Sequence, residues 1–129
     1  MGYAPYADED YYSDVYEGDI LDYDVVEKSL RNASRHIDSL TFNRIVGRGF
    51  SNLTPFQKEV VREVCCELAE FEYENADLIR SVLQSYSING VSMSFGSSWN
   101  VKVISGVAIR ADIYDKLAQT GLCSTALGR

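Results

Sequence analysis

Hydrophobic and polar residues alternate with a helical period over residues 53–74, LTPFQKEVVREVCCELAEFEYE. At 100° per residue, one stripe of apolar side chains contains Phe56, Val60, Val61, Val64, Leu68 and Phe71. The opposite face carries Lys58, Glu59, Arg62, Glu63 and Glu70. Thr54, Pro55 and Gln57 form a start signature, with Thr54 as the cap and Gln57 completing a capping box. We therefore predict a long scaffold helix to about Asn75, with residues 78–83 either continuing it or beginning a strand.

A second helical period follows Asp22, which we expect to cap the helix. Its apolar residues are spaced by four, three, four and three positions, at Val26, Leu30, Ala33, Ile37 and Leu40. This spacing predicts packing against another helix, and we expect the helix to run to about Arg44. Gly47 and Gly49 then break it and leave Arg48 at the tip of a surface loop.

The segment 85–96, SYSINGVSMSFG, has the pattern of a β-hairpin. Its apolar positions are Tyr86, Ile88, Val91, Met93 and Phe95. They lie around Asn89-Gly90, a pair that suits a type I′ turn. A helix continuing through Ser85 is the competing interpretation of the first arm. Because a lone hairpin is marginal in water, we expect it to contact another subunit, the alternative being packing on its own scaffold helix. Trp99, in the next loop, should be partly buried or at an interface.

The end of the chain predicts one more helix and a docking segment. Ser105 could cap a helix in which Ile109, Ile113 and Leu117 stack at four-residue spacing, ending before Gly121. The segment 122–129, LCSTALGR, then leaves the domain. It contains Leu122 and Leu127 as candidate anchors and ends in Arg129, and the alternative is a disordered tail.

Residues 1–21 form an acidic segment rich in tyrosine, whose side chains offer large amphipathic contact areas. Six tyrosines occur at positions 3, 6, 11, 12, 16 and, just beyond, 23. Asp8 could cap a short helix over residues 9–17, stopped by Gly18. The alternative is a frayed acidic tail.

Together these elements predict a mainly α fold: a small bundle of three to four helices around a long central helix, with one β-hairpin. The length of 129 residues indicates a single domain over 1–129. The net charge of −7, from 19 acidic and 12 basic residues, opposes stable binding to a phosphate backbone. The lack of an apolar run of about 18 residues excludes a membrane span, and the acidic start lacks a secretory signal, so we expect a cytoplasmic protein.

Candidate chemistry is sparse. Cys65, Cys66 and Cys123 have no metal-binding spacing with the lone His36, and we expect buried thiols and a surface or rim histidine. The sequence contains no paired carboxylates in an apolar pocket pattern and no Ser-His-Asp arrangement with framing glycines. We therefore expect no catalysis, no metal and no cofactor.

The order of these parts resembles the small head-tail connector proteins of tailed bacteriophages, also called adaptor or head completion proteins. The resembling stretches are NASRHIDSLTFNRI at 32–45, LTPFQKEVVREVCCELAE at 53–70, SINGVSMSF at 87–95 and YDKLAQTGLCSTALGR at 114–129. No single motif is diagnostic. The serial combination carries the resemblance, particularly the Ala-Ser-Arg-xx-Ile-Asp-xx-Thr-Phe helix followed by Thr-Pro-Phe-Gln and a late Thr-Gly-Leu.

The resemblance implies a structural virion protein, assembled in the host cytoplasm, that forms a dodecameric ring under the portal protein. Such a ring extends the channel through which genomic DNA passes without specific binding, and docks a further connector (stopper) or tail protein. Candidate interface residues are Ile88, Asn89, Gly90, Val91, Met93, Phe95, Trp99, Arg48, Leu122, Leu127 and Arg129. The alternative is a tail-assembly chaperone absent from the particle, or another cytosolic acidic binding module.

Overall fold

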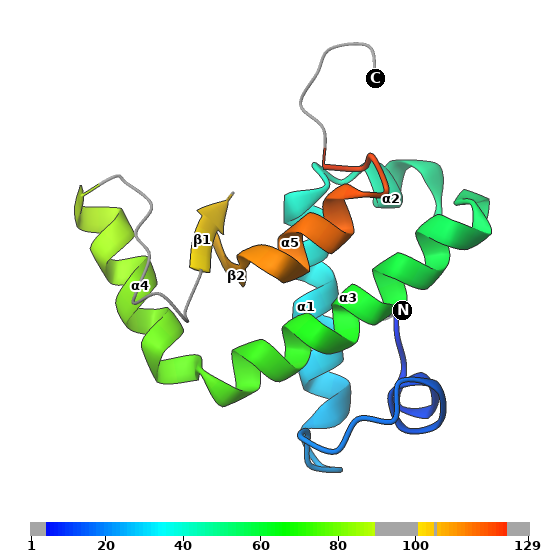
Figure 1. The fold of residues 1–129 in the computed structure, drawn as a ribbon, viewed down its shortest axis with the longest axis horizontal. Coiled ribbons are helices and arrows are strands. Elements are labelled where there is room, and N and C mark those ends of the chain that lie inside the picture. The colour runs from blue at the N-terminus through cyan, green and yellow to red at the C-terminus, as the bar shows by residue number, and fades with distance from the viewer. Residues whose placement is uncertain (1–4, 90–100, 105, 124–129) are drawn as a thin grey trace.

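A computed structural model describes residues 5–89, 101–104 and 106–123 and shows a body built mainly from helices (Figure 1). The helices are α1 (Val26–Leu40), α2 (Arg44–Arg48), α3 (Pro55–Glu74), α4 (Ala76–Asn89) and α5 (Ala111–Ala118). Strands β1 (Val101–Ile104) and β2 (Val107–Arg110) form an antiparallel hairpin. The predicted mainly α fold with one hairpin is confirmed.

Helix α3 is the scaffold that α1 and α5 pack against. It begins as predicted, because the Gln57 amide donates to Thr54 Oγ1 at 3.1 Å and the Thr54 amide donates to Gln57 Oε1 at 3.0 Å. Helix α1 crosses α3 where Ser34 Oγ lies 3.3 Å from Cys65 Sγ. The five predicted apolar residues of α1 are all buried.

The buried face of α3 is wider than the predicted stripe. Cys65, Cys66 and Ala69 are buried together with the predicted valines, Leu68 and Phe71. Phe56 was predicted to be buried but is 51% exposed. The added residues shift the centre of the buried face, so that at 100° per residue Phe56 falls at its margin.

Helix α3 ends where the sequence predicted, at Asn75. The Asn75 side chain donates from Nδ2 to the Phe71 carbonyl at 3.0 Å, and the chain bends before α4 begins. Residues 78–83 are therefore helical. Helix α4 runs to Asn89, so the hairpin predicted at 85–96 is wrong in its first arm. An Asn-Gly pair is also typical of a helix end, and α4 ends at Asn89.

The hairpin that the structure describes is formed by residues 101–104 and 107–110. Its register pairs Val101 with Arg110 and Ile104 with Val107. Gly106 has φ 80° in the connection, a conformation that glycine adopts without strain. Ile109 belongs to β2, so the helix predicted from Ser105 begins later, at Ala111, because the apolar run is strand before it is helix.

Helix α1 has different ends from those predicted. Asp22 does not begin it; the Asp22 carbonyl accepts from the amides of Val25 and Val26 through a preceding turn, and α1 begins at Val26. It ends at Leu40 rather than about Arg44, because Phe42 and Asn43 have φ values of 56° and 59° and redirect the chain into α2.

The N-terminal segment, which the structure describes from Pro5, packs on the body. The Asp8 carboxylate accepts from the Tyr11 amide at 2.9 Å, and a π-helical turn follows over Tyr11–Val15. The short capped helix was therefore the better of the two alternatives. Gly18 serves close packing, since a Cβ atom there would lie 2.2 Å from the Tyr12 ring. None of the described helices combines the length and apolar character that a membrane crossing requires.

Candidate docking groove

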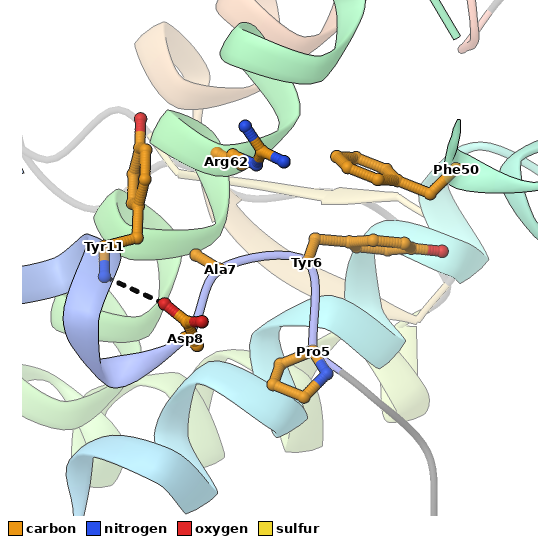
Figure 2. Close-up of a pocket in the computed structure, with 7 residues that line it drawn as sticks. All are labelled: Pro5, Tyr6, Ala7, Asp8, Tyr11, Phe50 and Arg62. Carbon is orange, nitrogen blue, oxygen red and sulfur yellow. Dashed lines mark hydrogen bonds between the residues drawn. The ribbon is translucent and has the colours of Figure 1, made fainter. Parts of the chain in front are cut away.

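The N-terminal segment and the body together form an open groove of about 430 Å³ (Figure 2). Its lining residues come from the N-terminal segment, from the turn before α3 and from α3 itself: Pro5, Tyr6, Ala7, Asp8, Tyr11, Phe50 and Arg62. Residues 5–11 are thus joined to residues about fifty positions later. We call this surface the docking groove.

One wall of the docking groove is fixed to α1 by hydrogen bonds. The Tyr6 amide donates to Ser34 Oγ at 2.9 Å, and the Tyr6 hydroxyl donates to Asp38 Oδ1. Ala7, next in the chain, is only 2% exposed. The wall is therefore held at the Tyr6 backbone and side chain, and its shape does not depend on a partner.

The Tyr6 ring also takes part in a cluster that combines aromatic rings with a cation. The rings of Tyr6 and Phe50 stack with centroids 5.3 Å apart, and the Arg62 guanidinium carbon lies 5.2 Å from the Phe50 centroid. Figure 2 shows Arg62 between Tyr11 and Phe50. Among the described residues Arg62 forms no ion pair with a carboxylate. The groove therefore offers aromatic surface and an unpaired positive charge.

Two tyrosines anchor the segment further along, on the far side of the π-helical turn. The Tyr12 hydroxyl donates to Glu70 Oε2 at 2.8 Å and accepts from the amides of Ile20 and Leu21 at 3.0 and 2.9 Å. The Tyr16 hydroxyl donates to Glu70 Oε1 at 3.1 Å. Burial, together with the Glu70 charge, raises the pKa of Tyr16. Both hydroxyls therefore stay protonated and act as donors at neutral pH.

A second hollow, of about 300 Å³, lies among α1, α3, α4 and β2. At its edge His36 Nδ1 lies 2.5 Å from Glu72 Oε2, and Ile79 and Leu83 of α4 supply apolar lining. The hydrogen bond to Glu72 raises the pKa of His36, against the effect of burial. The pair therefore connects α1 with α3 beside the start of α4.

The cysteines are buried thiols, as predicted. Burial raises the pKa of Cys65 to about 11 and also raises the pKa of Cys66. In the part of the chain that the structure describes, no three His, Cys, Asp or Glu side chains come together in a way that could hold a metal ion.

Only four of the predicted interface residues lie in the part of the chain that the structure describes: Arg48, Ile88, Asn89 and Leu122. Arg48 was predicted at the tip of a surface loop but is the exposed last residue of α2, which also contains Gly47, and Ile88 and Asn89 belong to α4. Leu122 was predicted as a docking anchor but is 2% exposed, and its carbonyl accepts from Arg44 Nη1 at 3.0 Å. It belongs to the core because the turn after α5 folds back onto α2. Outside the described residues lie Gly90, Val91, Met93, Phe95, Trp99, Leu127 and Arg129.

The docking groove was not predicted, because its walls are distant in sequence. The signal that pointed toward it was the density of tyrosines in residues 1–21, which predicted contact with something without indicating where. Comparison with known proteins adds no assignment to this geometry: no family model, no curated protein and no solved structure matches the chain.

Proposed function

We propose that this chain is a structural subunit of a tailed bacteriophage virion, assembled in the host cytoplasm, that forms a homo-oligomeric ring under the portal protein. The ring completes the DNA-filled head, extends the DNA channel and docks a stopper or tail protein. The proposal rests on the serial sequence resemblance to head-tail connectors, and the helical fold agrees with it.

The structural observation that supports the proposal is the presence of two exposed surfaces on one small subunit. The docking groove is the first. The second, which we call the α2 end, consists of three exposed apolar side chains at one end of the molecule: Phe42, Val46 and Phe56, exposed by 46%, 59% and 51%. They lie around α2 and the first turn of α3, and α2 contacts the turn that leads into α3.

A subunit in a ring stacked between two other components needs contacts of two kinds, one to its neighbours and one along the axis. Exposed apolar surface commonly marks such contacts. The docking groove suits the first kind because its stacked rings can receive a side chain. The α2 end suits axial docking because residues 119–123 meet α2 there, where Arg44 bonds the Leu122 carbonyl, and residues 124–129 continue from that point.

The charge of the chain agrees with a channel role. At −7 a ring of many copies repels the phosphate backbone, so DNA can slide through without adhering.

The test is to remove the gene from the phage genome that encodes this chain and to examine the particles. We expect DNA-filled heads without tails, and we expect the protein in purified wild-type particles by mass spectrometry. Its absence from particles, with a defect in tail-tube length or assembly instead, would contradict the proposal and favour the chaperone alternative.

A further inference from the structure

We propose that the docking groove receives Tyr23 of a second copy of this chain, with Asp24 of that copy paired with Arg62. This inference rests on the proposed ring and names the contact between neighbouring subunits within it.

Tyr23 is the best candidate for the inserted side chain. It is 89% exposed, the highest exposed fraction among the large hydrophobic residues that the structure describes. It lies at the centre of an exposed Asp22-Tyr23-Asp24 turn before α1. A tyrosine held out on an ordered turn costs little conformational entropy when it binds, because it has few rotatable bonds.

The chemistry of the turn complements that of the groove. The groove presents the Tyr6 and Phe50 rings, against which a third ring can stack, and the unpaired Arg62 guanidinium beside them. Asp24 is exposed, whereas the Asp22 carboxylate already accepts from the Tyr73 hydroxyl at 3.2 Å. Asp24 is therefore the carboxylate free to approach Arg62. Asp8 also lines the groove, but its Oδ1 accepts from the Tyr11 amide.

A chain cannot place Tyr23 in its own groove. Tyr23 precedes the first residue of α1, whereas the groove wall is bonded to Ser34 and Asp38 in the second half of that helix. At 1.5 Å per residue the two lie on the order of 15 Å apart along α1. Tyr23 and the docking groove lie on different surfaces of one subunit, so a contact between them joins two copies head-to-tail. Such a contact generates a ring when the rotation between copies closes.

Photocrosslinking tests the contact directly. Unlabelled protein carries p-benzoylphenylalanine in place of Tyr23, and it is mixed at high concentration with an isotopically labelled wild-type chain and irradiated. We expect mixed-isotope adducts that map to residues 5–11, Phe50 or Arg62. The same photoreactive residue in place of Phe56, exposed at the α2 end, is the matched control and should not label the groove.

A charge exchange gives a second, independent measurement. Arg62→Glu and Asp24→Arg should each lower the adduct yield at least about tenfold, on the scale of losing an interface hot spot, and the two together should restore it. Arg80→Glu is the control, since Arg80 lies on α4, is 69% exposed and pairs with Asp77 at 3.2 Å. Circular dichroism of each variant verifies that the fold is retained.

The outcomes separate this contact from the proposed ring. If the groove binds another occupant, such as residues 1–4 of the same chain or a different protein, no adduct between copies should map to the groove. That result would overturn the proposed contact. Rings seen by light scattering with adducts elsewhere would likewise overturn the contact and leave the ring. Adducts in the groove of a protein that is absent from particles would support the contact and overturn the virion role.

Discussion

The change Tyr12→Phe tests whether the N-terminal segment is part of the core. It removes one hydroxyl and keeps the ring. Tyr12 is 3% exposed, and its ring leaves no room for a Cβ atom at Gly18. The hydroxyl bonds Glu70 and the amides of Ile20 and Leu21 at 2.8, 3.0 and 2.9 Å. A buried polar group left without its partner costs about 1–3 kcal/mol, and Leu21 is buried.

Because Ile20 is only partly buried, water can replace part of the loss there. We therefore expect Tyr12→Phe to lower the free energy of unfolding by about 2–4 kcal/mol, a large share of the roughly 5–15 kcal/mol that such domains have. Tyr16→Phe is the matched control. It removes one 3.1 Å hydrogen bond to the same carboxylate and should cost at most about 1 kcal/mol.

The measurement is urea unfolding followed by circular dichroism, with the free energies of the two variants compared with the wild type. A Tyr12→Phe variant within about 0.5 kcal/mol of the wild type would show that the anchor is not stabilising. Equal losses in both variants would refute the role given to the two backbone amides.

Three further predictions concern other parts of the chain. Leu122→Ala should cost about 2–5 kcal/mol in urea unfolding because Leu122 is 2% exposed, whereas removal of residues 124–129 should leave stability nearly unchanged and block head completion. Because the pKa of His36 is raised, the stability contributed by its pairing with Glu72 should be fully present below pH 6.5 and should be lost as the pH rises through the raised pKa. His36→Gln should remove that pH dependence of stability. The buried Cys65 thiol, with a pKa of about 11, should react with a thiol reagent at pH 8 far more slowly in folded than in urea-unfolded protein.

The helices were predictable from sequence wherever local signals agreed. For α3 the period, the Thr54 cap and the Asn75 stop all pointed to the same bounds. For α1 the apolar spacing gave the buried face, but its ends depend on a turn at Asp22 and on the left-handed conformation of Phe42. Tertiary packing decides such ends, and a bulky aromatic residue with positive φ has no sequence signature.

A hairpin was predicted, but its first arm was placed in residues that belong to α4. The Asn89-Gly90 pair favoured a hairpin at 85–96, although Asn-Gly serves both hairpin turns and helix ends. The segment that forms the hairpin, 101–110, alternates less clearly because Ala108 and Ile109 are buried next to each other. The period of the hydrophobic positions alone cannot distinguish a strand buried on both faces from a short helix. The docking groove could be found only when distant residues were placed together.

The anchoring of the N-terminal segment and the docking groove are coupled through the chain. Tyr12 fixes the segment to α3, and it lies only four positions after Asp8 at the edge of the groove. One wall therefore exists only while the segment is docked, whereas Phe50 and Arg62 stay on the body. Undocking separates Tyr6 from the Phe50 ring and removes the stacked surface that a neighbouring Tyr23 needs. Loss of the anchor should thus weaken ring formation as well as stability, while Arg62→Glu should weaken ring formation alone. That difference separates a role in folding from a role in recognition.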